Sequence, residues 1–114
     1  LSAPKKEELL QLFKNINNSQ HSIASIASYL IVHKHLSIPM LLAINRRFQE
    51  ETSDVKILYF YVANETIFRT KDKGLEYVSA FGDSLQSWME NFTQYTEDFY
   101  QLDTVFKILE LWEQ

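Results

Sequence analysis

The sequence predicts an all-α domain in which seven short helices follow one another along a right-handed solenoid. Turn-forming residues are scarce, because the 114 residues include only 2 glycines and 2 prolines, whereas these two types make up about 12% of an average protein. Apolar residues recur at the helical spacing i, i+3, i+4, i+7 in one segment after another. Sheet sandwiches and barrels need many turns, and a four-helix bundle needs longer helices, so the pattern favours a solenoid of short helices.

The first three predicted helices are marked by their starting residues and by apolar stripes. Pro4 is a favoured first-turn residue. Ser19 is suited to cap the second helix, which extends to about residue 35, and Ser37 is suited to cap the third. The residues expected to face inward are Leu9, Leu12, Phe13, Ile16, Ile23, Ile26, Ala27, Leu30, Leu41, Ile44 and Phe48.

The fourth predicted helix, about residues 53–71, is apolar on nearly every side between Val55 and Ala63. A helix that is hydrophobic all round belongs at the centre of a bundle or solenoid. We therefore expect this helix to contact several others, and we expect Gly74 to stop it.

Gly82 is predicted to end a short fifth helix, and a sixth helix follows it. A polar stretch at residues 93–98 leads into the seventh helix, which extends to the end of the chain. The core stripe of this last helix comprises Leu102, Val105, Leu109 and Trp112, so Trp112 is expected to be buried. A second, mixed stripe comprises Thr104, Lys107, Ile108 and Leu111.

Length and charge exclude several classes of protein. The 114 residues fit one domain, residues 1–114, which we expect to be part of a longer protein because the chain has no initiating Met. The longest apolar run, residues 57–63, is shorter than the roughly 20 residues of a membrane span. A net charge of −4 argues against nucleic-acid binding through a broad basic face, and the absence of cysteine excludes disulfides and thiol chemistry.

Enzyme signatures are also missing from the sequence. There is no glycine-rich phosphate loop, no His-Glu-x-x-His motif and no Gly-x-Ser-x-Gly motif. His33 and His35 would diverge by about 200° on a helix and could not share a metal ion. We therefore expect no catalytic residue, no metal site and no cofactor.

One constellation of residues on the fourth helix points to a binding surface. Tyr61, Asn64, Glu65 and Phe68 lie at i, i+3, i+4, i+7, so polar groups interrupt an otherwise apolar face. Buried polar groups need partners. This face and the mixed stripe of the last helix could together form a groove that grips an extended peptide. Alternatively, Asn64 and Glu65 could cap neighbouring helix ends or meet water.

Residues 61–74 of the fourth predicted helix and its end read YVANETIFRTKDKG. Together with three further segments in the same order along the chain, they resemble the RNA polymerase II CTD-interacting domain, called the CID or RPR domain, in which this stretch reads YLANDVIQNSKxKG. The other three are residues 17–23 (NNSQHSI, similar to NSQQSI), 76–82 (EYVSAFG, similar to EFVxxF) and 105–113 (VFKILELWE, similar to VxRLLxIWE). The resemblance covers about residues 7–114 and looks most like the transcription-termination and pre-mRNA-regulation branch.

The resemblance implies a right-handed superhelix of about eight helices, similar to VHS, ENTH and armadillo-like folds. It also implies a nuclear, non-enzymatic partner of the phosphorylated C-terminal domain of the largest RNA polymerase II subunit. The heptad repeats of that tail would dock in a groove made by helices two, four and seven. It implies no direct contact of this domain with nucleic acid or membrane, and it leaves the oligomeric state open.

Site residues follow from the resemblance position by position. Tyr61 would pack on the prolines and tyrosine of the peptide, and Asn64 and Glu65 would hydrogen-bond the peptide turn and its tyrosine. Lys107 would meet a serine phosphate. The remaining groove residues would be Ser19, Gln20, Phe68, Ile108 and Leu111.

Three departures from the family pattern bear on specificity. Glu65 replaces an aspartate, which makes the side chain one methylene longer. Lys107 replaces the arginine of relatives that read the phosphate of the second serine, and so offers a point charge rather than a bidentate fork. The third departure is the pair Phe68 and Arg69, which replace glutamine and asparagine. Arg69, Lys71 and Lys73 could offer a compensating basic edge, or they could simply form a solvated helix end.

Two other functions remain possible for a solenoid of this kind. A VHS- or ENTH-like vesicle-traffic adaptor would read sorting peptides or lipid headgroups. A lipid-binding site at the N-terminus would need a basic amphipathic helix. Lys5 and Lys6 do not supply one, because Glu7 and Glu8 follow them directly. The other alternative is a purely structural or dimerisation solenoid.

Overall fold

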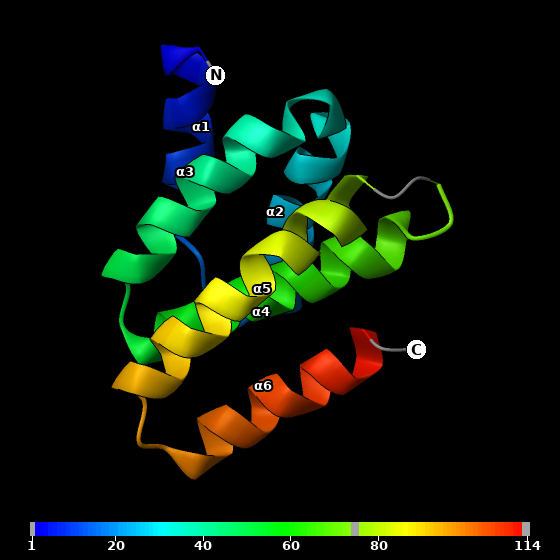
Figure 1. Cartoon of the computed structure of the whole chain (residues 1–114). Helices are drawn as coiled ribbons and strands as arrows, with labels where there is room; N and C mark the ends of the chain where they lie inside the picture. The colour runs from blue at the N-terminus through cyan, green and yellow to red at the C-terminus, as the bar shows by residue number, and fades with distance from the viewer. Residues whose placement is uncertain (1, 74–75, 113–114) are drawn as a thin grey trace.

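The computed structural model describes residues 2–73 and 76–112. These residues form six α-helices and one 3-10 helix, joined by short connections (Figure 1). The elements are α1 (Ala3–Lys14), α2 (Gln20–Val32), the 3-10 helix η1 (Lys34–Leu36), α3 (Ser37–Glu50), α4 (Ser53–Thr70), α5 (Glu76–Tyr95) and α6 (Phe99–Trp112). No strand occurs in these ranges. The predicted all-α class is therefore confirmed.

The predicted start of α2 agrees with the structure, but the predicted start of α3 does not. The Ser19 hydroxyl accepts a hydrogen bond from the backbone N–H of Ser22 at 3.1 Å, so Ser19 caps α2 as predicted. The second helix ends at Val32 rather than near residue 35, and the 3-10 helix η1 leads directly into α3. Ser37 is therefore already helical, and the prediction that it caps α3 was wrong.

The predicted fifth and sixth helices are one continuous helix, α5, and Gly82 lies inside it. The helix continues because its buried stripe runs through this position at helical spacing, with Tyr77 and Phe81 before Gly82 and Trp88 and Phe92 after it. Packing of these four aromatic side chains outweighs the roughly 1 kcal/mol that a glycine costs inside a helix. The predicted seventh helix is accordingly α6, and the described residues form six α-helices instead of the predicted seven to eight.

Gly82→Ala is expected to raise the free energy of unfolding by about 0.5–1 kcal/mol, which is the usual difference in helix propensity. Apart from the adjacent residues and the backbone of α5 itself, no atom lies within 4 Å of the position that an alanine Cβ would take at Gly82, so the substitution causes no clash. Urea unfolding followed by circular dichroism measures the change. A variant less stable than the parent would contradict the continuous α5.

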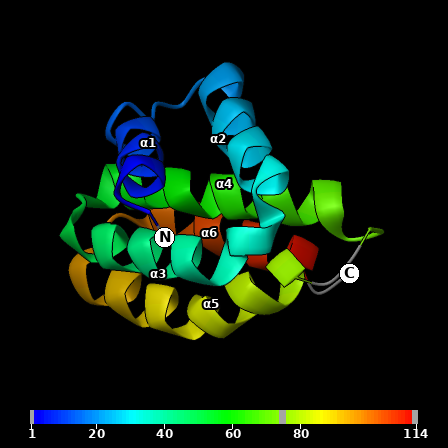
Figure 2. The same ribbon diagram turned by 90° about the horizontal axis from the view of Figure 1, so that it is seen from above.

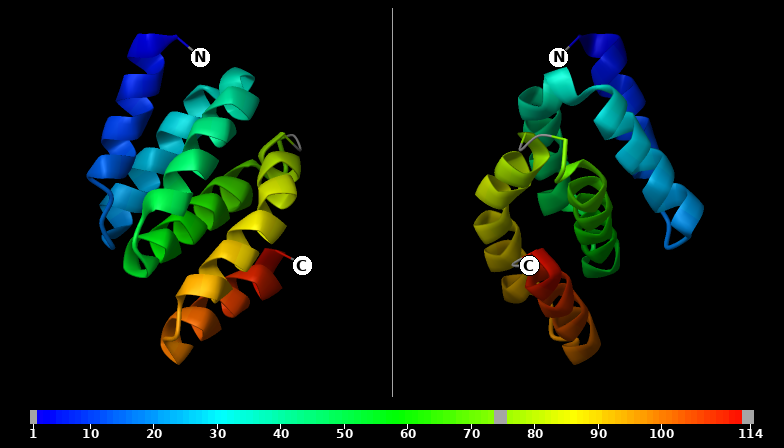
Figure 3. Two further views of the ribbon diagram at one scale, coloured as in Figure 1. Left: turned by 60° about the vertical axis from the view of Figure 1, so that its left-hand side comes forward. Right: turned by 90° about the vertical axis from the view of Figure 1, so that its right-hand side faces the viewer.

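Helix α4 lies at the centre of the fold, as its all-round hydrophobicity predicts. It contacts α2, α5 and α6, and α3 packs beside α5 (Figure 2). Helix α1 packs on α3 and lies at the opposite end of the molecule from α6 (Figure 3). This arrangement leaves one face of α4 between α2 and α6, where the groove was predicted.

An aromatic cluster joins α3, α4 and α5. The Phe48 and Trp88 rings stack with centroids 4.7 Å apart and planes 9° apart, and the Tyr59 and Phe60 rings meet Phe48 at 5.6 and 5.8 Å. The Trp88 indole N–H donates to the amide oxygen of Asn45 at 2.7 Å, so its polar atom is satisfied within the core. The burial predicted for Trp112 falls on a side chain outside the described residues.

No single helix in the described part of the chain is long and apolar enough to cross a membrane. Helix α2 and the following residues 34–50 reach that length and composition only as a pair, and the pair is bent by 81°.

Candidate functional site

Two adjoining hollows lie where α2, α4 and α6 come together, and we call them together the groove. The larger, about 420 Å³, is lined by Asn18, Asp54, Val55, Ile57, Leu58, Tyr61, Tyr100, Gln101 and Thr104. The smaller, about 190 Å³, is lined by Asn18, Ser19, Gln20, Ile23, Tyr61, Asn64 and Glu65. Asn18 and Tyr61 line both, so the two hollows adjoin at these residues.

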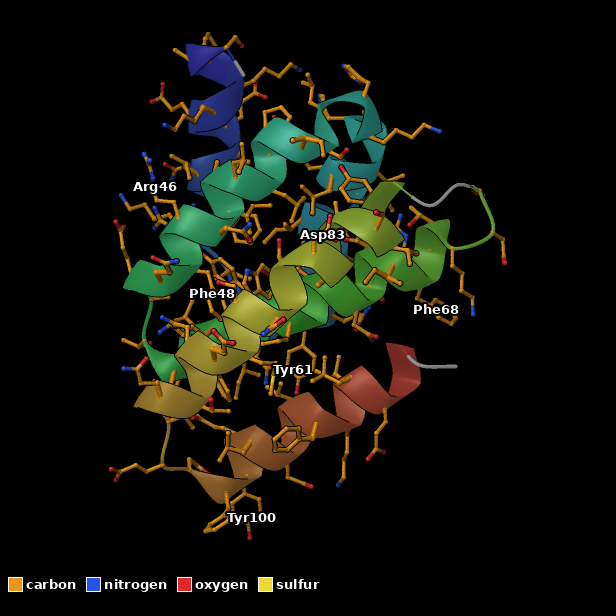
Figure 4. All side chains as sticks on the ribbon, in the orientation of Figure 1. Arg46, Phe48, Tyr61, Phe68, Asp83 and Tyr100 are labelled. Atoms are coloured by element: carbon orange, nitrogen blue, oxygen red, sulfur yellow. The ribbon has the colours of Figure 1, made fainter. Side chains whose placement is uncertain are left out.

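The structure brings five of the predicted site residues to this groove, namely Ser19, Gln20, Tyr61, Asn64 and Glu65. Tyr61 is half-buried and packs against the core, and it lies in the space between α4 and α6 (Figure 4). Asn64 and Glu65, each half-buried, follow one turn later on the same face of α4. The helical spacing that suggested a mixed face thus produces a real concavity.

The first turn of α2 is built by local hydrogen bonds. The backbone N–H of Ser19 donates to the side-chain oxygen of Asn17 at 2.9 Å, and the N–H of Asn17 donates to the Ser22 hydroxyl at 3.1 Å. Such side-chain caps fix the direction in which the chain enters a helix. Asn18 is held between them and reaches both hollows.

The predicted residues of the last helix take different positions on α6. Ile108 is buried in the hydrophobic core with 5% of its surface exposed. Lys107 is exposed, and its ammonium lies 2.9 Å from the carboxylate of Asp103, which raises the pKa of Lys107 mainly through this hydrogen bond. Neither residue lines the two hollows, and the side chain of Leu111 lies outside the described residues.

Phe68 and Arg69 lie beyond the end of the groove on α4. Phe68 is exposed, with the Lys71 ammonium 4.9 Å from its ring centroid. The Arg69 guanidinium donates to the Ser28 hydroxyl at 3.2 Å and to the Ala24 carbonyl at 3.4 Å, and so ties α4 to α2. Because both oxygens are uncharged, the positive charge of Arg69 is not neutralised by these contacts.

Thr104, which lines the larger hollow, belongs to the predicted mixed stripe, but sequence reasoning missed Tyr100 and Gln101 on α6 and Asp54 at the start of α4. Gln101 donates to the Asp54 carboxylate and so joins the first turns of these two helices. Tyr100 and Gln101 lie one turn before Thr104, so the mixed stripe of the last helix already points to them when it is extended by one turn. Asn18 lies in the segment 17–23 that carries part of the family resemblance, but no helical stripe points to it, because it precedes a helix.

The groove combines apolar side chains with amides and carboxylates. Val55, Ile57 and Leu58 supply apolar surface, and Asn and Gln side chains can both donate and accept hydrogen bonds. A peptide backbone needs both kinds of partner, so the groove is suited to an extended or turned peptide. Among the described residues, no group of three or more His, Cys, Asp or Glu side chains could hold a metal ion.

Comparison with known proteins gives one family match. Residues 7–114 match the family model described as CID domain. The chain is 24% identical over its whole length to regulation of nuclear pre-mRNA domain-containing protein 1A of Homo sapiens, of which it spans 36%. Over 71% of its length it is 27% identical to protein 1B of Homo sapiens, of which it covers 25%. The 1A protein of Gallus gallus is 22% identical over the whole chain, which spans 42% of that relative.

Proposed function

We propose, because this chain belongs to the CID domain family, that its groove binds phosphorylated heptad repeats of the RNA polymerase II C-terminal tail. CID domains are non-catalytic, VHS-like helical domains that generally bind this tail. Beyond this general property of the family, we propose the binding surface, the contacting residues and the preference for phosphorylated repeats. The proposal also includes the right-handed stacking of the helices that the resemblance implies.

The observation that carries the proposal is the meeting of two hollows at Tyr61. A turned peptide needs a central apolar contact and polar partners on both sides of it. Tyr61 offers the ring, with Asn64 and Glu65 on one side and Thr104 on the other. We propose that Tyr61 packs on the peptide's prolines and tyrosine, and that Asn64 and Glu65 hydrogen-bond the turn. Ser19 and Gln20 would border the same end of the peptide.

Lys107, Arg69 and Phe68 are proposed to contact the parts of the peptide that leave the groove. The exposed Lys107 ammonium on α6 is available to a serine phosphate once it separates from Asp103. Arg69 would offer a weaker second phosphate contact, and Phe68 an apolar contact. Ile108 and Leu111 would form the apolar backing of the peptide-binding side of α6.

The cellular role is proposed from the family and its relatives. The matched relatives are named for regulation of nuclear pre-mRNA. We therefore place the chain in a nuclear transcription-termination or pre-mRNA-processing factor. The family match at residues 7–114 favours this role over a vesicle-traffic adaptor built on a similar fold.

Asn64→Ala is expected to weaken heptad-peptide binding by about 5- to 150-fold, since a hydrogen bond lost in a desolvated groove costs about 1–3 kcal/mol. Isothermal titration with phosphorylated and unphosphorylated heptad peptides measures this loss, and a thermal melt checks the fold. The matched control is Gln49→Ala, which removes a side-chain amide from an exposed position on α3 outside the groove and should bind normally. A lower melting temperature of Asn64→Ala with unchanged affinity would show that Asn64 is a structural cap instead.

Asp103→Asn is expected to tighten binding of phosphorylated heptad peptide by about two- to fivefold and to leave unphosphorylated peptide unaffected. The substitution frees the Lys107 ammonium and removes a carboxylate that would repel the phosphate. Adding Lys107→Ala to this variant should abolish the part of the gain that comes from the freed ammonium. If Asp103→Asn affects both peptides alike, Lys107 does not meet the phosphate.

A further inference from the structure

A trough is lined by residues of α1 and α3. These two helices lie at the end of the molecule opposite α6 (Figure 1). The trough consists of two hollows of about 490 and 280 Å³, which share Lys6, Leu10 and Arg47. None of its lining residues lines the groove at Tyr61. Figure 4 shows Arg46 on the α3 side of this end, far from Tyr100 at the start of α6.

The floor of the trough is apolar and open to solvent. Leu10, Pro39 and Leu42 line it, and 67% of the Leu42 side chain is exposed. Ile38, one turn before Leu42 on α3, is 65% exposed and extends the apolar strip. Contiguous exposed apolar residues rimmed by charge typically mark an interaction surface.

The rim of the trough is positively charged although the whole chain carries a net charge of −4. Four cations line it, Lys6, Lys14, Arg46 and Arg47, against two carboxylates, Glu7 and Glu50. None of the four cations forms an ion pair with another residue in the described part of the chain. The trough therefore presents unneutralised positive charge beside apolar surface.

Arg47 contributes a guanidinium group to this surface, since the residue lines both hollows of the trough. Its Nε is buried, and its side chain also acts on the buried Tyr59 hydroxyl through its charge and a side-chain hydrogen bond. Guanidinium groups bind carboxylates with short, charge-assisted hydrogen bonds.

We propose that the trough is a second binding surface, which takes an acidic amphipathic peptide segment of a partner protein. The apolar side chains of the segment lie on Leu10, Pro39 and Leu42, and its carboxylates meet Arg46, Arg47 and Lys6. A planar bilayer cannot follow the concave space between two helices, so the shape favours a peptide over a lipid surface. Because the two surfaces share no residue, the domain can hold this partner and a groove ligand at the same time.

The test is an NMR titration of the isotope-labelled chain with a synthetic helical peptide that carries leucine and phenylalanine along one face and glutamates beside them. A second peptide has glutamine in place of every glutamate. We expect the acidic peptide alone to shift the amides of Leu10, Leu42 and Arg47. Arg46→Glu should weaken its binding about tenfold or more, and the matched charge reversal Lys34→Glu, on the exposed 3-10 helix outside the trough, by no more than about twofold.

Three results would overturn the proposal. The first is equal binding of the glutamate and glutamine peptides, and the second is a set of shifted amides around Tyr61 instead of Leu42. The third is Arg46-dependent sedimentation with phosphatidylserine vesicles in the absence of any peptide binding, which would assign the surface to lipid. Heptad-peptide affinity, measured in parallel, should be unchanged in the Arg46→Glu variant, so this test is independent of the groove.

Discussion

Phe48→Ala is expected to lower the free energy of unfolding by about 3–5 kcal/mol, which is the usual cost of truncating a buried phenylalanine. Phe48 is fully buried, stacks on Trp88 and contacts the rings of Tyr59 and Phe60. Its removal therefore leaves a cavity where α3, α4 and α5 meet. Since small domains are stable by only about 5–15 kcal/mol, this one change removes a large share of the total.

Urea unfolding followed by far-ultraviolet circular dichroism measures the effect without depending on the fluorescence of nearby Trp88. The matched control is Phe99→Ala, because Phe99 is 85% exposed at the start of α6. The control is expected to change the free energy of unfolding by less than about 0.5 kcal/mol. Equal losses from the two variants would mean that the aromatic cluster does not hold the three helices together.

Tyr61→Ala is expected to weaken heptad-peptide binding by about 30-fold or more, which corresponds to the roughly 2 kcal/mol of a binding hot spot. Tyr61 lines both hollows, so its truncation removes the contact that joins the two halves of the groove. The loss should be the same for phosphorylated and unphosphorylated peptides, because the ring carries no charge. Isothermal titration with both peptides measures it.

Two further variants separate the parts of this effect. Tyr61→Phe keeps the ring and should lose about tenfold at most, the contribution of one hydrogen bond. Phe106→Ala removes a partly exposed aromatic ring from α6 outside the groove and should bind normally. If Tyr61→Ala binds as tightly as Phe106→Ala while remaining folded, the groove is not where the peptide docks.

The sequence predicted the class and the centre of the fold because both depend on local spacing of apolar residues. The all-round hydrophobicity of residues 55–63 identified α4 as the central helix, and its contacts with α2, α5 and α6 confirm this. The predicted number of helices was wrong because the low helix propensity of Gly82 was taken as a sign that a helix ends there. Its position within a buried stripe that spans Tyr77 to Phe92 decided the outcome instead.

The residues that α4 contributes to the groove could be predicted from the sequence. The positions of the residues on α6 could be predicted only in part. Tyr61, Asn64 and Glu65 share a helical face, which fixes their common direction. The pairing of Lys107 with Asp103 could also be read from their spacing of four residues. The burial of Ile108 could not, because it depends on how α6 rotates against α4, and this rotation is a tertiary property.

The side-chain amide of Asn45 on α3 favours one packing arrangement of the helices over alternative arrangements. It accepts from the Trp88 indole and donates to the Ser84 hydroxyl at 2.9 Å, so it has two directional partners on α5. Apolar contacts are non-directional, so they specify the register of two helices less sharply than hydrogen bonds do. A slipped register would break both hydrogen bonds and would leave the half-buried Asn45 amide and the buried Trp88 indole N–H without these partners. An unsatisfied buried donor costs about 1–3 kcal/mol. The two hydrogen bonds of the Asn45 amide therefore help to fix the position of α5 along α3. They increase the energy gap between the native packing and near-native alternatives.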